Sequence, residues 1–279
     1  MDRLAYTALM GTSEANHPRQ QLSNELANLS TIGFKRSFTN AMKSLKIDGP
    51  GLDTRFQPMN LQYDRISLAP GPLMTTGNPL DISLNGSTVL GVSASNGDLA
   101  FTRRGDLRVN SAGQLENSSG QTVRGQNGPI TVPLGYALEI SGDGSVYASS
   151  PDKTRTAPPV LVGRLLLRDA SATPLERRDD GLFQPMSASN SSKAMGNLTN
   201  KNLTSQTALT QGGSQAGQDI TDGDIAPSLT SGTLEGSNVT SFEAMTRLLD
   251  FNRSFEAHIK MIKEVNSLEQ SGASMIKAS

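Results

Sequence analysis

The feature that most limits how this chain can fold is a long helical pattern over residues 237–276. This stretch contains no proline and a single glycine, Gly272. Thr240, followed three residues later by Glu243, has the pattern of a capping box, so we expect the helix to begin there. A helix of roughly 35 residues is about 50 Å long, which is more than a compact domain needs at its terminus. We therefore expect this helix to pack against other helices.

Apolar side chains follow the spacing of a coiled-coil seam along the same stretch. Counted together with His258, they recur in alternating steps of three and four at Leu248, Phe251, Phe255, Ile262 and Val265. Met245, Leu249 and Ile259 flank this seam, so the helix is apolar nearly all round and needs more than one neighbour. The alternatives to a larger helical assembly are a helix that covers its own β domain and a simple coiled-coil dimer.

The first thirty residues also favour a helix, whose apolar row is Leu22, Leu26 and Leu29. Pro18 removes a backbone donor, so this helix must kink or restart there. Gly33 is the expected helix stop. The candidate subunit-packing residues are this row, the phenylalanine after the stop and the C-terminal seam: Leu22, Leu26, Leu29, Phe34, Leu248, Phe251, Phe255, Ile262 and Val265.

Between the two helical patterns, the hydrophobic period changes to two. Apolar residues alternate with polar ones in Leu80, Ile82 and Leu84, in Leu99 and Phe101, and in Leu138 and Ile140. Four turn dipeptides separate such pieces, and each predicts a hairpin with a type I′ turn: Asn85-Gly86, Asn96-Gly97, Asn127-Gly128 and Asp143-Gly144. The predicted fold class is mainly β with long terminal α-helices. It consists of an antiparallel β domain, an irregular sandwich or barrel, plus paired N- and C-terminal helices.

These patterns divide the chain into five segments. They are an N-terminal helix over 1–40, an extended connector over 41–79, a β domain over 80–186, a polar flexible segment over 187–236 and a coiled-coil-like helix over 237–279.

The composition argues against most kinds of chemistry. The chain has no cysteine, which excludes a catalytic thiol, a disulfide and a thiolate metal site. A net charge of −1 gives no electrostatic reason to expect nucleic acid. His17 and His258 lie far apart in sequence, and nothing places two carboxylates as a catalytic pair. We therefore expect no enzyme activity, no cofactor, no metal and no small-molecule substrate.

Three local clusters have ordinary interpretations. Asp219, Asp222 and Asp224 lack the spacing of an EF-hand and are interpreted as a solvated acidic loop. His258 is interpreted as a packed or solvent-edged residue rather than a ligand. The pair Arg103-Arg104 with Asp106 fits either a partner-binding patch or a surface strand with local ion pairing, which contributes little energy.

Several motifs in sequence order carry a family resemblance. They are SNELANLSTIGFK at 23–35, GNPLDISLNG at 77–86, FTRRGDLRVNSAGQLENSSGQTVRG at 101–125, GPITVP at 128–133, DGLF at 180–183 and GTLEGSNV at 232–239. In these motifs the chain resembles the axial proteins of the bacterial flagellum, most closely the proximal-rod branch of the basal-body rod proteins. Arg253, Phe255, Glu256 and Lys260 are similar to the family's C-terminal helix.

The resemblance implies a structural subunit of the proximal rod. Its terminal helices would pack in an inner layer with other rod subunits and neighbouring axial proteins, and its β domain would face outward. It would cross the periplasm after export, without a cleaved signal peptide, by the flagellar type III apparatus. The N-terminus has no apolar run long enough for a signal-peptide core, which alone would suggest a cytoplasmic protein. The alternatives are a distal-rod or hook protein, or a secreted β-rich carbohydrate-binding protein, which 4% aromatic residues and no tryptophan disfavour.

Overall fold

The computed structural model describes residues 16–38, 42–46, 56–60, 65–133, 135–150, 158–186, 218–220 and 223–277. The chain divides into two compact units. The helical unit takes residues 1–29, 38–64 and 239–279, and the β unit takes residues 30–37 and 65–238.

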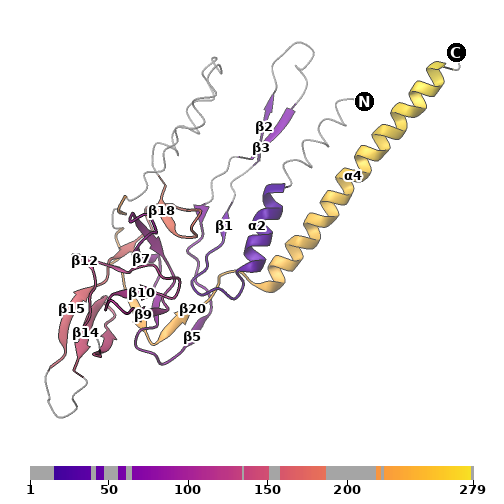
Figure 1. Ribbon diagram of the computed structural model, residues 1–279. Helices are drawn as coiled ribbons and strands as arrows, with labels where there is room; N and C mark the ends of the chain where they lie inside the picture. Colours follow the sequence, from indigo (N-terminus) through magenta and orange to yellow (C-terminus); the bar gives the residue numbers. More distant parts are fainter. Residues whose placement is uncertain are drawn as a thin grey trace, which may run out of the picture. The chain divides into compact units, whose positions relative to one another are not determined.

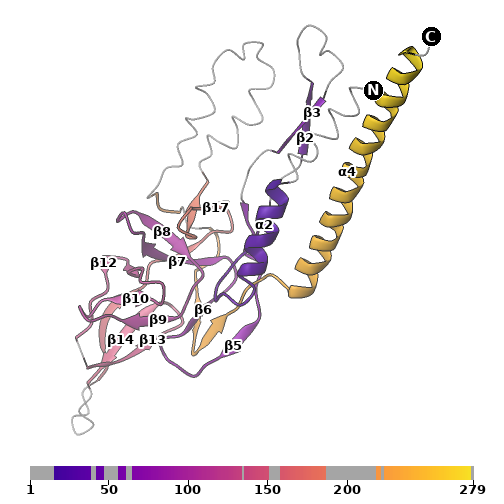
Figure 2. The same cartoon turned by 45° about the vertical axis from the view of Figure 1, so that its right-hand side comes forward.

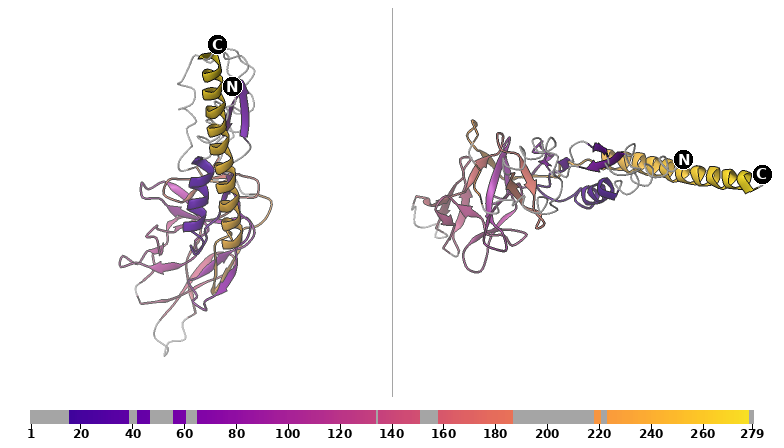
Figure 3. Two further views of the ribbon diagram at one scale, coloured as in Figure 1. Left: turned by 90° about the vertical axis from the view of Figure 1, so that its right-hand side faces the viewer. Right: turned by 90° about the horizontal axis from the view of Figure 1, so that it is seen from above.

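Two helices dominate the described part of the helical unit. They are α2 (Asn16–Ala27) and α4 (Ser241–Lys277). Strands β2 (Met42–Lys46) and β3 (Phe56–Asn60) of this unit pair as an antiparallel hairpin. In all views α2 lies beside the first part of α4 and runs antiparallel to it (Figures 1, 2 and 3).

The C-terminal helix has the predicted length, and its first residue is capped as predicted. The backbone N–H of Glu243 donates to Thr240 Oγ1 over 3.3 Å, which satisfies one of the free donors at the helix start. Over its 37 residues α4 is about 55 Å long.

The N-terminal helix fits the predicted restart at Pro18 but differs from the prediction at Gly33. Pro18 lies in the first turn of α2, where its missing N–H removes no helical hydrogen bond. The helix ends at Ala27 and does not reach Gly33. Gly33 instead belongs to the β unit, where its N–H donates to the carbonyl of Glu235 over 2.7 Å. A long N-terminal helix paired along α4 is not observed in the described part of the chain, and residues 1–15 lie outside it.

The β unit contains one large sheet and several small ones. The large sheet has seven strands in the order β1-β4-β17-β18-β8-β7-β16, and its pairs from β4 to β16 are antiparallel. The smaller pairings are β13-β14-β15, β9-β10, β11-β12, β6-β19 and β5-β20, all antiparallel. The bounds are β1 (Ser37–Phe38), β4 (Arg65–Ile66), β5 (Leu73–Thr75), β6 (Ile82–Leu84), β7 (Thr88–Ser93), β8 (Leu99–Thr102), β9 (Leu107–Val109), β10 (Leu115–Asn117), β11 (Arg124–Gly125), β12 (Gly128–Pro129), β13 (Ala137–Ile140), β14 (Ser145–Ser149), β15 (Val160–Arg164), β16 (Leu167–Asp169), β17 (Leu175–Arg177), β18 (Phe183–Pro185), β19 (Leu229–Ser231) and β20 (Thr233–Glu235).

Strands β7 and β8 are buried on both faces. Successive side chains of a strand point to opposite faces, and each face here meets its own apolar cluster. Leu90 and Val92 join the larger cluster, whereas Val89 and Phe101 join the smaller one. This central position explains why Ala100, which lies between Leu99 and Phe101, is fully buried too.

Two fold predictions need correction. The sheet orders are linear and no sheet among the described strands closes on itself, so the barrel alternative is wrong. The β unit also includes β4, β5, β19 and β20, from sequence outside 80–186. These strands have two or three residues each, too few for an alternating pattern to emerge from polar surroundings.

Three of the four turn dipeptides mark hairpins, and none has the predicted turn type. Asn96-Gly97, Asn127-Gly128 and Asp143-Gly144 connect paired strands, whereas Asn85-Gly86 connects β6 to β7, which do not pair. A type I′ turn needs positive φ at both central residues. In the residues that the structure describes, only glycines have positive φ, so the type I′ prediction is wrong.

Candidate functional site

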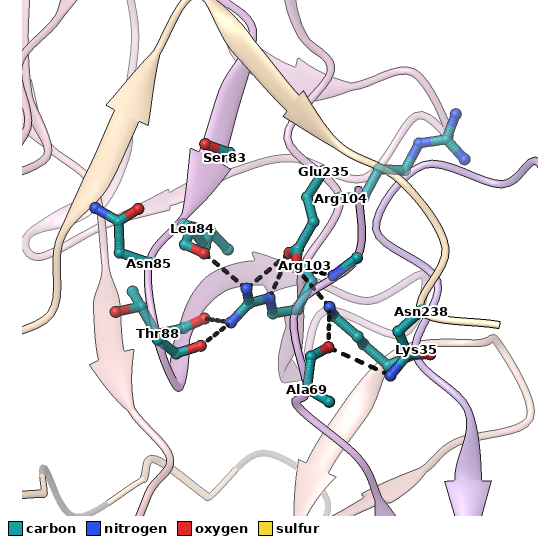
Figure 4. Close-up of polar contacts among 12 residues, drawn as sticks. Lys35, Ala69, Ser83, Leu84, Asn85, Thr88, Arg103, Arg104, Glu235 and Asn238 are labelled. Carbon is teal, nitrogen blue, oxygen red and sulfur yellow. Dashed lines mark hydrogen bonds and ion pairs between the residues drawn. The ribbon is translucent and has the colours of Figure 1, made fainter. Parts of the chain in front are cut away.

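A cluster of three charged residues lies fully buried in the β unit (Figure 4). We call Lys35, Arg103 and Glu235 the ion triad. Lys35 Nζ lies 2.6 Å from Glu235 Oε1, and Arg103 Nη2 lies 2.7 Å from Glu235 Oε2. The side chains of the lysine, arginine and glutamate are 0%, 1% and 2% exposed. Since a buried charge is tolerated only when it is paired and hydrogen-bonded, both cations depend on Glu235.

The backbone satisfies the remaining hydrogen-bonding groups of the triad. Arg103 donates to the carbonyls of Leu84, Gly86 and Thr88 over 2.6 to 3.0 Å. Lys35 Nζ donates to the carbonyl of Ala69 over 2.8 Å, and the N–H of Gly71 donates to Glu235 Oε1 over 2.9 Å. The triad therefore connects five backbone positions as well as its own charges.

Two cations share one carboxylate in this cluster, and both the lysine and the glutamate have a lowered pKa, for different reasons. Burial alone would raise the pKa of Glu235, but Arg103 and the Lys35 hydrogen bond outweigh it, so the pKa lies below the ordinary 4.5. Burial lowers the pKa of Lys35 below its ordinary 10.5, against the opposing hydrogen bond to Glu235, and the charge of Arg103 lowers it further.

The two adjacent arginines have separate roles, which corrects the interpretation of both as surface residues. Arg103 is buried in the triad, whereas Arg104 points away from it (Figure 4) and binds Asp106 over 2.7 Å. Neighbouring residues of an extended chain point to opposite sides. One of the two arginines therefore had to turn inward.

Close backbone contacts bring the triad together. Gly33 has a φ of +69°, and a Cβ atom at this position would lie 2.5 Å from the backbone carbon and oxygen of Arg103. A Cβ on Gly71 would lie 2.3 Å from the carbonyl oxygen of Gly236. Only glycine allows such approaches, which gives Gly33, a residue of the motif at 23–35, a steric reason.

Phe34 packs inside the β unit. It is 7% exposed, and the guanidinium of Arg177 lies 4.6 Å from its ring centroid. Arg177 also donates to the carbonyl of Lys35 and lies 5.8 Å from the ring of Phe183. This cation–π packing accounts for Phe34 within one chain, although it was a candidate for packing between subunits.

The second candidate site is the surface of α4. An ion pair joins the two helices, with Arg247 Nη1 3.6 Å from Glu25 Oε2. Glu25 is 2% exposed, and Arg247 also binds Glu243 one turn before it over 2.7 Å. Leu22, on α2, is 8% exposed. The other two residues of its row, Leu26 and Leu29, are half-buried.

The predicted seam residues have graded exposure along α4. Leu248, Phe251 and Ile262 are half-buried, and Val265 is buried. Phe255 is 40% exposed, and its ring stacks on that of Phe251 with centroids 6.3 Å apart. The seam is thus partly covered within one chain and retains apolar surface.

A second apolar row on α4 is far more exposed. Phe242, Met245 and Leu249 are 81%, 58% and 58% exposed. Their steps of three and four place them on one face of the first turns, and we call them the exposed stripe. Buried Ala244 lies two residues after Phe242, on the other side of the helix. The sequence identified Met245 and Leu249 as flanking residues but missed Phe242, since it precedes the repeating seam.

The remaining clusters suggest no chemistry. Asp219 binds Arg168 over 2.7 Å, and Asp222 lies outside the residues that the structure describes. Among the described residues, no three metal-ligating side chains are grouped to hold an ion. No helix in the described ranges is both long enough and apolar enough to span a membrane.

Comparisons with known proteins agree on one family. The family model "Flagellar hook protein FlgE/F/G D1 domain" matches residues 83–148, and "Flagellar basal body rod FlgEFG protein C-terminal" matches residues 230–275. The chain is 34% identical to the flagellar basal-body rod protein FlgF of Salmonella typhimurium, covering 96% of each chain. It is 32% identical to FlgF of Escherichia coli over 95% of each chain. A flagellar basal-body rod protein FlgG of Buchnera aphidicola is 26% identical over 89% of this chain and 90% of its own.

Proposed function

Since the chain belongs to the family of flagellar basal-body rod proteins, we propose that it joins the rod through apolar faces of its terminal helices. It is a structural subunit of the bacterial flagellar basal body. The proposal concerns how it assembles: α4 binds other rod subunits and neighbouring axial proteins by burying side chains that the single chain leaves in water.

The exposed stripe is the observation that carries this proposal. Phe242, Met245 and Leu249 together are a contiguous apolar row on a helix that is otherwise strongly polar on that side. Burying one such side chain is worth about 1.5–3 kcal/mol. Three of them on one face are therefore enough to bias a helix towards docking.

The seam supplies a second contact surface. Phe255 and its stacked partner Phe251 lie on a different side of α4 from the stripe. A helix with two apolar faces needs neighbours on two sides, which fits a tubular assembly better than a simple dimer. Leu22, Leu26 and Leu29 of the N-terminal row, with Leu248, Ile262 and Val265, complete the proposed helix-packing set.

We place the subunit in the proximal rod. The stretches at 128–133 and 232–239 support this branch, and the two FlgF relatives share more identity with the chain than the FlgG relative does. Export by the flagellar type III apparatus without signal cleavage, and a position across the periplasm, follow from this placement. A distal-rod or hook location is the alternative, and labelling of isolated hook–basal bodies separates the two.

The test is a pair of substitutions on α4. Phe242→Asp puts a charge on the stripe, and Asn266→Asp puts the same charge on an exposed polar position. Each variant replaces the native protein in the bacterium, and the measurements are its amount in purified basal bodies and swimming motility. We expect Phe242→Asp to lose incorporation and Asn266→Asp to retain it, with equal circular dichroism for the two purified chains. Normal incorporation of both Phe242→Asp and Phe255→Asp would overturn helix-mediated assembly.

A further inference from the structure

The chain crosses between its two units four times. Each crossing begins or ends in one of three short segments of the β unit. The chain crosses at residues 29/30, 37/38, 64/65 and 238/239. The segments 30–37, 65–71 and 235–238 therefore lead to and from the helical unit. They are far apart in sequence, yet they are hydrogen-bonded to one another inside the β unit.

Asn238 binds two of these segments with its own side chain and backbone. Its Oδ1 accepts the N–H of Arg36 over 2.8 Å, and its N–H donates to the carbonyl of Phe34 over 3.2 Å. Its Nδ2 donates to the carbonyl of Ser67 over 3.0 Å, and the N–H of Ser67 donates to the carbonyl of Arg36 over 2.9 Å. One asparagine thus connects the segment after α2, the segment before α4 and the segment that returns to the β unit.

The ion triad connects the same three segments. Lys35 comes from the first segment and Glu235 from the last, and Lys35 also binds Ala69 in the middle one. Arg103 adds the β unit itself, since it is anchored by carbonyls on either side of the turn between β6 and β7. We call the triad together with Asn238 the junction.

Stability alone is a poor explanation for this arrangement. Desolvation of buried ions offsets much of their attraction, and apolar residues of the same volume often give equal or greater stability. Directional hydrogen bonds fix a single register between the segments that they join, whereas apolar packing does not. The junction has a directional bond to each segment.

We propose that Lys35, Arg103, Glu235 and Asn238 are positioning residues for assembly. They hold the segment that follows α2 and the segment that precedes α4 in one register, so that the chain enters and leaves the β unit at adjacent points. The inference rests on the proposed docking through the helices. It adds that apolar helix faces are not sufficient for incorporation into the rod unless the hydrogen bonds and ion pairs of the junction are also formed.

The sharpest variant is Asn238→Ala, because it removes three side-chain hydrogen bonds, to Arg36, Ser67 and Ala69, without leaving a buried charge unpaired. Asn85→Ala is the matched control. Asn85 lies in the turn whose carbonyls bind Arg103, but its side chain bridges two other segments of the β unit, through Ser228 and Thr230, and binds no member of the junction. Hydrogen exchange of both full-length variants reports the register directly. We expect the amides of Gly33, Arg36 and Asn238 to exchange about tenfold faster in Asn238→Ala, with β7 and β14 unchanged in both.

Incorporation into basal bodies then separates positioning from stability. At equal thermal stability of the two variants, we expect Asn238→Ala to be incorporated about tenfold less than Asn85→Ala, since losing hydrogen bonds worth about 1.4 kcal/mol in total changes an equilibrium tenfold. Equal incorporation of both, despite faster exchange at the junction, would overturn the proposal.

A second variant tests the triad itself. Replacing Lys35, Arg103 and Glu235 together by methionine removes the buried charges and keeps similar volume. We expect protected β strands, fast exchange at Gly33 and reduced incorporation. Full incorporation of this triple variant would refute a positioning role.

If Phe242→Asp and Phe255→Asp are incorporated normally, the docking model itself fails. If they fail while Asn238→Ala succeeds, only the junction is refuted.

Discussion

The β unit and helix α4 both depart from the usual placement of side chains. The β unit buries charged side chains, and α4 exposes apolar ones. The β unit encloses the three charged groups of the ion triad almost completely, whereas α4 leaves six large apolar side chains exposed, among them the three of the exposed stripe. The charged groups have all their partners within the chain, and the stripe side chains of α4 remain mostly in solvent. The triad is therefore complete within a single chain, whereas the exposed stripe is the surface through which we propose that other subunits bind.

The largest expected effect comes from breaking the triad on one side. Glu235→Gln leaves Lys35 and Arg103 buried without their carboxylate, and we expect the free energy of unfolding to fall by about 3–5 kcal/mol. Urea unfolding followed by circular dichroism measures this. The control is Arg164→Gln, which breaks an ion pair to Asp143 whose side chains are about half exposed, and it should cost about 0–1 kcal/mol. Equal losses in the two variants would mean that burial of the triad contributes nothing special.

The next effect tests the close approach that lets the triad form. Gly33→Ala must accommodate both a φ of +69° and a Cβ atom 2.5 Å from the backbone of Arg103. We expect it to lower the free energy of unfolding by at least about 2 kcal/mol. Gly77 has a similar φ of +73° with nothing within 4 Å of its Cβ position, so Gly77→Ala measures the backbone conformation alone, about 1 kcal/mol. Unfolding midpoints that coincide for the two variants would show that the contact with Arg103 relaxes without cost.

Acid should weaken the β unit through the same carboxylate. The pKa of Glu235 is lower in the folded chain than its ordinary 4.5. Its contribution to stability is therefore complete above about pH 4.5 and is lost as the pH falls through the folded value. The pKa of Lys35 is lowered from 10.5, so on raising the pH the folded chain releases this proton before the unfolded chain does. The contribution of Lys35 to the free energy of unfolding therefore rises with pH on the alkaline side. Unfolding free energies between about pH 7 and pH 3 should fall more steeply for the native chain than for Glu235→Gln; parallel curves would contradict this assignment.

The sequence predicted α4, its cap and the family, because these depend on residues close together in the chain. Thr240 and Glu243 are one turn apart, and the seam repeats over about five turns. The alternation that indicated β strands is likewise local. These patterns could be recognised without any knowledge of tertiary contacts.

The triad could not be predicted in the same way. Its partners are separated by 200 and 132 positions, and no periodic pattern connects such distances. Arg103 next to Arg104 gave no indication of which one turns inward, since that depends on the carbonyls that surround it. The end of α2 at Ala27 was missed for a related reason: Gly33 has the residue type of a helix stop, but tertiary contact with Arg103 determines its conformation.

The smallest effect on stability should come with the largest effect on assembly. Phe242→Ala removes a side chain that is 81% exposed, so the free energy of unfolding of the purified chain should change by no more than about 0.5 kcal/mol. The same deletion at Phe101, which is fully buried between β strands, should cost about 3–5 kcal/mol. Incorporation into basal bodies should respond differently, because Phe242→Ala lacks part of the proposed docking surface although the chain folds normally. Normal stability together with reduced incorporation would assign Phe242 to a contact with another subunit. A loss of stability comparable with that of Phe101→Ala would instead mean that Phe242 is covered by its own chain in solution, and the contrast between the two regions would disappear.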